Sequence, residues 1–106
     1  MSIEVYNKLV RDKIPGIIEK DGKKAVCEIL NDENFLALLD QKLIEEMDEY
    51  QESKDVEELA DLLEVIYAVS EARGISREKL EKIRCLKAEE RGAFQEKIML
   101  IQVASK

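Results

Sequence analysis

Two long helical segments joined by very few residues constrain the fold of this chain more than any other feature. Asn31 or Asp32 can cap a helix over residues 33–52, and Asp55 can cap a second helix over residues 56–73. Because so short a connection leaves no room for a crossover, we expect the two helices to form an antiparallel hairpin.

The second of these helices is apolar on nearly all sides. In the stretch LADLLEVIYAV the only charged residues are Asp61 and Glu64. A helix of this kind needs cover on several faces, and a chain of 106 residues supplies little of it. We therefore expect further copies of the chain to supply the rest, in a homodimer or a homotetramer.

Shorter helices are predicted on both sides of this hairpin. Residues 15–20 begin with a proline, which is tolerated in a first turn, and they are expected to form a short helix. Ser76 can cap a third helix over residues 77–91. Gly74 and Gly92 fit the left-handed positions at which helices end.

Two segments have the composition of short strands. Residues 25–30 alternate and are rich in β-formers, and residues 94–103 could pair with them. The predicted fold class is therefore all-α, an antiparallel helical bundle with an optional two-stranded β-hairpin. The length predicts a single domain over residues 1–106.

The composition excludes several kinds of chemistry. The chain contains no histidine, so a Ser-His-Asp triad, a Cys-His pair and a histidine zinc site are all impossible. Residues 28–64 hold two basic against fourteen acidic side chains and lie between basic flanks. Such a block attracts cations and is not a nucleic-acid footprint. No apolar run has the length of a membrane span, and the first residues lack the apolar core of a signal peptide, so a cytoplasmic protein is expected.

Glu46 stands where the first long helix is expected to bury hydrocarbon. At about 100° per residue, it lies only about 20° beyond the edge of an apolar arc. That arc holds Leu36, Leu39, Leu43, Met47 and Tyr50. Glu49 lies roughly another 60° further round the helix, at the margin of the core. On the second helix a stripe of acids steps by three residues: Glu58, Asp61 and Glu64.

Carboxylates that converge between packed helices are unfavourable by themselves, because like charges repel and burial removes their hydration. The only basic residues within the acidic block are Lys42 and Lys54. A divalent cation would relieve the repulsion, and oxygen ligands favour Mg²⁺ or Mn²⁺ over Zn²⁺, with Ca²⁺ as a further alternative. The competing interpretation is an ordinary solvated acidic face. A separation of more than about 12 Å between Glu46 and Asp61 would argue against a shared metal.

Three ordered motifs resemble one enzyme family. The first is an ExxE…ExxD motif at 46–49 and 58–61, which resembles the signature of the all-α nucleotide pyrophosphohydrolases, the MazG-like superfamily. The stretches YNKLVRDKIP at 6–15 and KAEERGAF at 87–94 are similar to signatures of its small-protein, phosphoribosyl-ATP pyrophosphohydrolase-like branch. Ala93 stands in place of the second glycine that is often seen in the last motif.

This resemblance implies Mg²⁺-dependent hydrolysis between the α and β phosphates of a nucleotide, with release of pyrophosphate. Glu45 or Glu49 is a candidate general base that orients the attacking water. Glu64 is a candidate for a further ligand. The metal ligands implied by the motifs are Glu46, Glu49, Glu58 and Asp61.

Basic residues of the two flanking motifs are candidates for binding the substrate phosphates: Lys8, Arg11, Lys13, Lys87 and Arg91. The competing interpretation of each one is an ion pair with a surface acid.

The expected function is hydrolysis of a nucleoside triphosphate to its monophosphate and pyrophosphate, in nucleotide-pool house-cleaning. One alternative is the same reaction on phosphoribosyl-ATP in histidine biosynthesis. An alternative of another class is a non-catalytic helical module that forms oligomers, in which the acids point to solvent.

Overall fold

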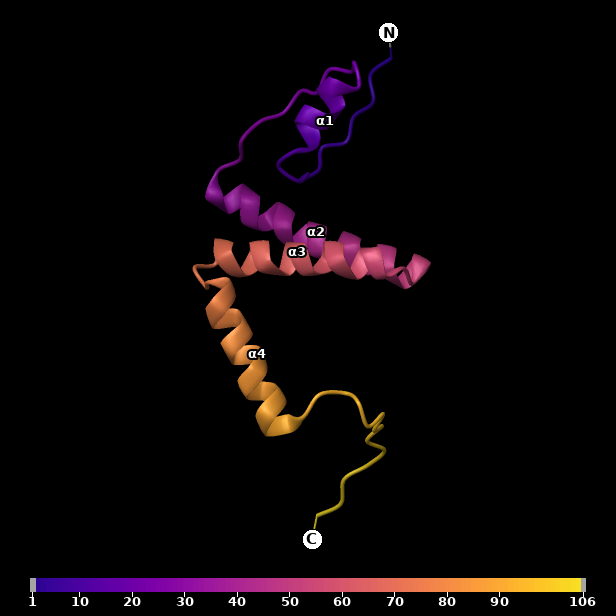
Figure 1. Cartoon of the computed structure of the whole chain (residues 1–106), viewed down its shortest axis with the longest axis vertical. Helices are drawn as coiled ribbons and strands as arrows, with labels where there is room; N and C mark the ends of the chain where they lie inside the picture. Colours follow the sequence, from indigo (N-terminus) through magenta and orange to yellow (C-terminus); the bar gives the residue numbers. More distant parts are fainter. Residues whose placement is uncertain (1, 106) are drawn as a thin grey trace.

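The computed structural model describes residues 2–105, and over that range it contains four helices and no strand. Figure 1 shows their order along the chain. All four lie where the sequence predicts them and begin or end within one or two residues of the predicted bounds. Their bounds are Ile14–Lys20 for α1, Asp32–Ser53 for α2, Val56–Ala72 for α3 and Arg77–Arg91 for α4.

Polar caps determine where the three long helices begin. The side chains of Asn31, Asp55 and Ser76 each accept a hydrogen bond from a backbone N–H two or three residues further on, at 2.8, 3.2 and 3.2 Å. These contacts satisfy backbone donors that have no partner within the helix. The predicted caps are confirmed, with Asn31 rather than Asp32 at the start of α2.

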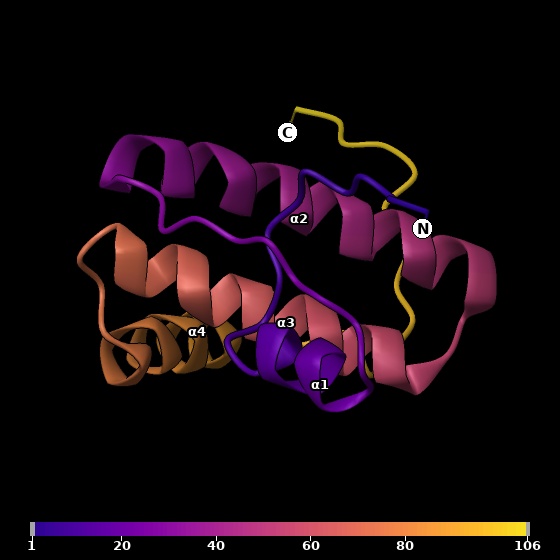
Figure 2. The same cartoon turned by 90° about the horizontal axis from the view of Figure 1, so that it is seen from above.

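α2 and α3 form the predicted antiparallel hairpin, and they lie side by side in two perpendicular views (Figures 1 and 2). Only Lys54 and Asp55 separate them. Lys54 closes α2 in the left-handed conformation, with φ of 58°, and its N–H donates to the carbonyl of Tyr50 at 2.8 Å. A lysine in this position lets the chain reverse within two residues, although its Cβ makes the conformation less favourable than it is for glycine.

The two predicted strands do not form, and this part of the fold prediction is wrong. Residues 25–30 and 94–103 carry no strand pairing. Figure 1 shows the reason: the first segment lies between α1 and α2, whereas the second extends away from the far end of α4. A strand needs a neighbour for its backbone groups, and these segments are on opposite sides of the hairpin. Their apolar side chains are consequently exposed, as Ile29 and Phe94 illustrate at 99% and 98%.

The buried core is very small. Leu39 and Val65 are the buried apolar residues of the described chain. The radius of gyration is 18.9 Å, whereas a compact domain of this size has one of about 13 Å. The molecule extends over 70 × 31 × 23 Å, and its two ends lie at opposite ends of the long axis (Figure 1). A single chain therefore buries little of the apolar surface that its sequence provides.

Much of that surface lies on one side of the hairpin, which we call the outer hairpin face. On each helix, the residues of this face lie about 100–160° around the helix axis from the residues that face the partner helix. The rotation has the same sense on both helices. In an antiparallel pair this places both stripes on the same side. The face consists of Ile44, Met47, Leu59, Leu63 and Ile66, all 37–58% exposed.

Met47 was expected to pack against the neighbouring helix, and that expectation is wrong, because it is 47% exposed. Glu46, the adjacent residue, occupies the inward position instead, with 6% exposure. Leu36, Leu43 and Tyr50 are half-buried, as the arc predicts. In the described part of the chain, no helix is both long and apolar enough to cross a bilayer.

Candidate metal centre

Acidic side chains from both hairpin helices meet in the half of the hairpin that is nearer to the turn between α2 and α3. Glu46 comes from α2, and Glu58 and Asp61 come from the first turns of α3. One carboxylate oxygen from each of the three lies within 4.8 Å of the others. This separation is well inside the 12 Å limit set by the sequence argument, so the three acids are close enough to share one cation.

A second acidic group overlaps the first. Glu45, Glu46 and Glu49 also place carboxylate oxygens within 4.8 Å of one another. Glu46 belongs to both groups, so the five acids assigned by the sequence to metal binding and base catalysis form one connected cluster. Glu64 belongs to neither group; it is exposed and lines the cavity next to the cluster.

Glu46 is the least accessible member of this cluster and the buried charged residue of the described chain. Its Oε1 lies 3.5 Å from Nζ of Lys42, one helical turn earlier. Its Oε2 is fully enclosed and has no hydrogen-bond partner. A buried carboxylate oxygen without a partner is unfavourable, so a further positive group is needed at this point.

The cluster raises the pKa of two of its carboxyl groups. The pKa of Glu46 is raised chiefly by burial and then by the negative charge of Glu49, against a smaller lowering effect of Lys42. The pKa of Glu58 is raised first by desolvation, then by a hydrogen bond from its carboxyl group to Glu49 and by the charges of Glu49 and Asp61. Without a cation, the site therefore holds its protons more tightly than isolated carboxyl groups do.

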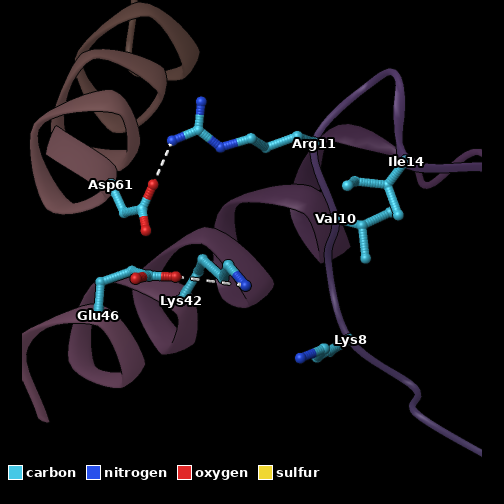
Figure 3. A pocket seen from close by; sticks show the side chains of 7 residues that line it. All are labelled: Lys8, Val10, Arg11, Ile14, Lys42, Glu46 and Asp61. Atoms are coloured by element: carbon cyan, nitrogen blue, oxygen red, sulfur yellow. Dashed lines mark hydrogen bonds and ion pairs between the residues drawn. The ribbon is translucent and has the colours of Figure 1, made fainter. Parts of the chain in front are cut away.

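The segment before α1 closes one side of this acidic cluster. Nη2 of Arg11 donates a hydrogen bond of 2.6 Å to Oδ1 of Asp61, and Figure 3 shows the arginine reaching across to α3. Nζ of Lys8 lies 3.7 Å from Oε1 of Glu45. Together they border a cavity of about 270 Å³, whose lining residues are Lys8, Val10, Arg11, Ile14, Lys42, Glu46 and Asp61.

A larger cavity of about 570 Å³ continues from this site toward the start of α2 and the end of α3. Its walls include the apolar Phe35, Leu39 and Val65 as well as the charged Glu71 and Arg77. The guanidinium of Arg77 lies 3.9 Å from the centre of the Tyr67 ring. Charged and apolar surfaces thus adjoin in one open groove.

The structure separates the predicted phosphate-binding residues into two sets. Lys8 and Arg11 line the cavity at the acids, and Lys13 lines the larger adjoining cavity. Lys87 and Arg91 are exposed on α4 and line neither cavity. Figure 1 shows that α4 leads away from the hairpin, which accounts for their distance from the acids.

Sequence reasoning did not assign Lys42 to the site. The structure places its Nζ 3.5 Å from carboxylate oxygens of both Glu45 and Glu46. The signal was available, because residues three and four apart on a helix are neighbours. Lys42 was counted only as one of two lysines in the acidic block.

The donor set fits a hard divalent cation. It consists of carboxylate oxygens alone, which are the ligands that Mg²⁺, Mn²⁺ and Ca²⁺ prefer. One of these oxygens, Oε2 of Glu46, is buried and has no hydrogen-bond partner.

Comparisons with protein-family models, with curated proteins and with solved structures find no match for this chain.

Proposed function

We propose that this protein is a MazG-like nucleotide pyrophosphohydrolase that cleaves the bond between the α and β phosphates of a nucleoside triphosphate. The single observation that carries the proposal is the buried, unpartnered Oε2 of Glu46, which lies beside carboxylates from a second helix. A solvated acidic face does not bury its acids, so this observation favours a cation site over the non-catalytic module. The proposed setting is the cytoplasm, and the proposed role is control of the nucleotide pool.

Glu46, Glu49, Glu58 and Asp61 would hold Mg²⁺, or Mn²⁺ in its place. When bound, such an ion neutralises phosphate charge and lowers the pKa of a coordinated water. The acids contribute negative charge at fixed positions on two rigid helices. The acids alone would repel the phosphates of the substrate, so the basic side chains that line the cavity, Lys8 and Arg11, would bind them.

Of the two candidate bases, Glu49 is the better placed. Glu45 is engaged by the ammonium groups of Lys8 and Lys42, at 3.7 and 3.5 Å. Glu49 is exposed and interacts with the carboxyl groups of Glu46 and Glu58. In the proposed reaction Glu49 accepts a proton from the attacking water, while Glu45 holds Lys8 beside the phosphates.

The proposed active form is a homodimer or a homotetramer. The outer hairpin face offers five exposed apolar side chains on one side of α2 and α3. Relative to the core residues Leu39 and Val65, three of the acids are turned in the sense opposite to the outer hairpin face: Glu46, Glu49 and Asp61. A partner on the outer hairpin face would therefore leave the metal site open to substrate. Burial of that face would enlarge a core that, over residues 2–105, contains two apolar residues.

Pyrophosphate release tests the proposed reaction. The full chain is incubated with NTPs, dNTPs and phosphoribosyl-ATP, with Mg²⁺ or with a chelator, and products are followed by ³¹P NMR. The expected products are a monophosphate and pyrophosphate, in the Mg²⁺ samples only. Glu58→Gln is expected to lower the rate by about 100-fold or more, the range seen when a key electrostatic group is removed. Asp48→Asn, at an exposed acid of α2, is the matched control.

Release of orthophosphate instead of pyrophosphate would contradict the bond assignment. No cleavage of any of these substrates would overturn the enzymatic proposal and favour the helical module. Cleavage of phosphoribosyl-ATP alone would assign the reaction to that substrate, since the acids serve the phosphates in both cases.

A further inference from the structure

The chain supplies its own cations to the acidic cluster. Lys42 pairs with Glu46 from within the same helix, at 3.5 Å. Arg11 pairs with Asp61 across 50 residues of sequence, at 2.6 Å. The guanidinium therefore already neutralises Asp61, one of the four carboxylates that would hold a divalent ion.

These two pairs differ in how easily they are replaced. Lys42 is anchored on α2, and its side chain is 17% exposed. Arg11 lies in an irregular segment before α1, and its side chain is 55% exposed. Asp61 is itself 42% exposed on its side chain, so water and ions reach the pair. An open pair of this kind contributes little to stability, which makes it replaceable.

We propose that Arg11 is an exchangeable internal cation of the metal site. Its guanidinium pairs with Asp61 when no divalent ion is bound, and the incoming ion displaces it. The released guanidinium then binds the phosphates of the substrate, close to where it started. This inference rests on the proposed function for its second step, whereas the exchange itself concerns the metal alone.

Electrostatics supply the reason for the exchange. A divalent ion on Asp61 and a guanidinium at 2.6 Å from the same carboxylate repel each other. The substrate brings several negative charges, for which a freed guanidinium offers a planar pair of donors. Arg11 therefore opposes binding of the free metal and favours binding of the nucleotide, so its removal changes the two affinities in opposite directions.

Two titrations test this on the full chain. Binding of Mn²⁺ is measured by electron paramagnetic resonance of the free ion, for wild type, Arg11→Gln, Arg11→Lys and Arg73→Gln. Arg73 pairs with Asp40 at 3.4 Å and is as exposed as Arg11, so it is a matched control away from the site. Binding of a triphosphate analogue with a methylene bridge between the α and β phosphates is then measured at saturating Mn²⁺.

Arg11→Gln is expected to tighten Mn²⁺ binding by about fivefold, the equivalent of one exposed ion pair. The same variant is expected to weaken binding of the analogue by about tenfold, the equivalent of a lost charged hydrogen bond. Arg11→Lys is expected to keep the Mn²⁺ affinity of wild type within twofold, because it retains the charge. Arg73→Gln is expected to leave both affinities unchanged.

The outcomes separate this inference from the function on which it builds. If wild type binds no Mn²⁺, both the metal site and the exchange are wrong. If wild type binds Mn²⁺ and Arg11→Gln binds it equally or less tightly, the exchange is wrong and the metal site stands. If Mn²⁺ binding tightens but the analogue binds as before, the second step is wrong.

Discussion

Oε1 of Glu46 faces Nζ of Lys42 at 3.5 Å, while Oε2 of the same carboxylate is enclosed without a hydrogen-bond partner. A carboxylate in this position is half compensated. Lys42 compensates the charge at Oε1, whereas Oε2 remains buried without a positive partner. The carboxylates of Glu58 and Asp61 lie close to Glu46. This incomplete compensation is what a cation would remove.

The first prediction concerns the stability of the metal-free protein. Glu46→Gln is expected to raise the free energy of unfolding at neutral pH by about 1 kcal/mol, because it removes an uncompensated buried charge at nearly constant volume. Urea denaturation in the presence of a chelator measures the change. Asp48→Asn is the control, because it removes an equal charge from an exposed site on the same helix. A loss of stability in Glu46→Gln would show that the ion pair with Lys42 outweighs the burial.

The second prediction concerns pH. Glu46 and Glu58 have a raised pKa in the folded chain, above the ordinary value of 4.5 that applies after unfolding. Between these values the folded state binds more protons, so stability decreases as pH rises. This contribution is fully present below about pH 4.5 and is lost as pH rises through the folded-state pKa values.

The effect of Glu46 is isolated by measuring the free energy of unfolding of wild type and of Glu46→Gln as a function of pH and subtracting one from the other. The advantage of Glu46→Gln over wild type is expected to grow from about pH 4.5 upward and to be absent at lower pH. Saturating Mg²⁺ is expected to abolish the advantage in the neutral range. A pH-independent difference between the two proteins would contradict the burial of an ionised Glu46.

The third prediction concerns the oligomer. Leu63→Glu places a charge at the centre of the outer hairpin face and is expected to weaken self-association by more than about 100-fold, since a buried unpaired charge costs several kcal/mol. Sedimentation velocity over a concentration series measures it. Ile17→Glu on α1 is the control, because Ile17 is 54% exposed and Leu63 46%. Equal association of both variants would place the interface elsewhere.

The fourth prediction concerns the basic residues. Lys8→Gln is expected to lower kcat/KM for the cleaved nucleotide by about tenfold, because Lys8 borders the cavity at the acids and is worth one charged contact. Arg91→Gln is expected to change kcat/KM by less than about twofold, because Arg91 lies on α4 outside both cavities. Steady-state pyrophosphate release measures both. The reverse order would mean that α4 reaches the site, as a helix of a second subunit could.

The helices were predictable from the sequence because their signals are local. Capping side chains, helix-stopping glycines and the period of apolar residues each act within a few residues of the element they determine. The inward position of Glu46 follows from the same period. The exposure of Met47 was not predictable in this way, because packing against α3 determines the rotation of α2 about its axis. In the structure Glu46 faces inward and Met47 is exposed.

The strands and the long-range contacts were less predictable for the opposite reason. Whether residues 25–30 and 94–103 pair depends on where α1 and α4 direct the chain, which no local pattern specifies. The contact between Arg11 and Asp61 spans 50 residues. The sequence motifs therefore assign Arg11 to the substrate phosphates and Asp61 to the metal, but they do not assign the two residues to each other.

Thermal unfolding in the presence of Mg²⁺ tests most directly whether the acidic cluster is a metal site. A ligand that binds the folded chain alone raises the melting temperature as its concentration rises. The wild type is expected to show such a rise with Mg²⁺, with none at equal ionic strength in KCl, and Glu46→Gln is expected to lose most of it. An equal rise in both proteins would contradict the central role of Glu46, and no rise in either would contradict the metal site itself.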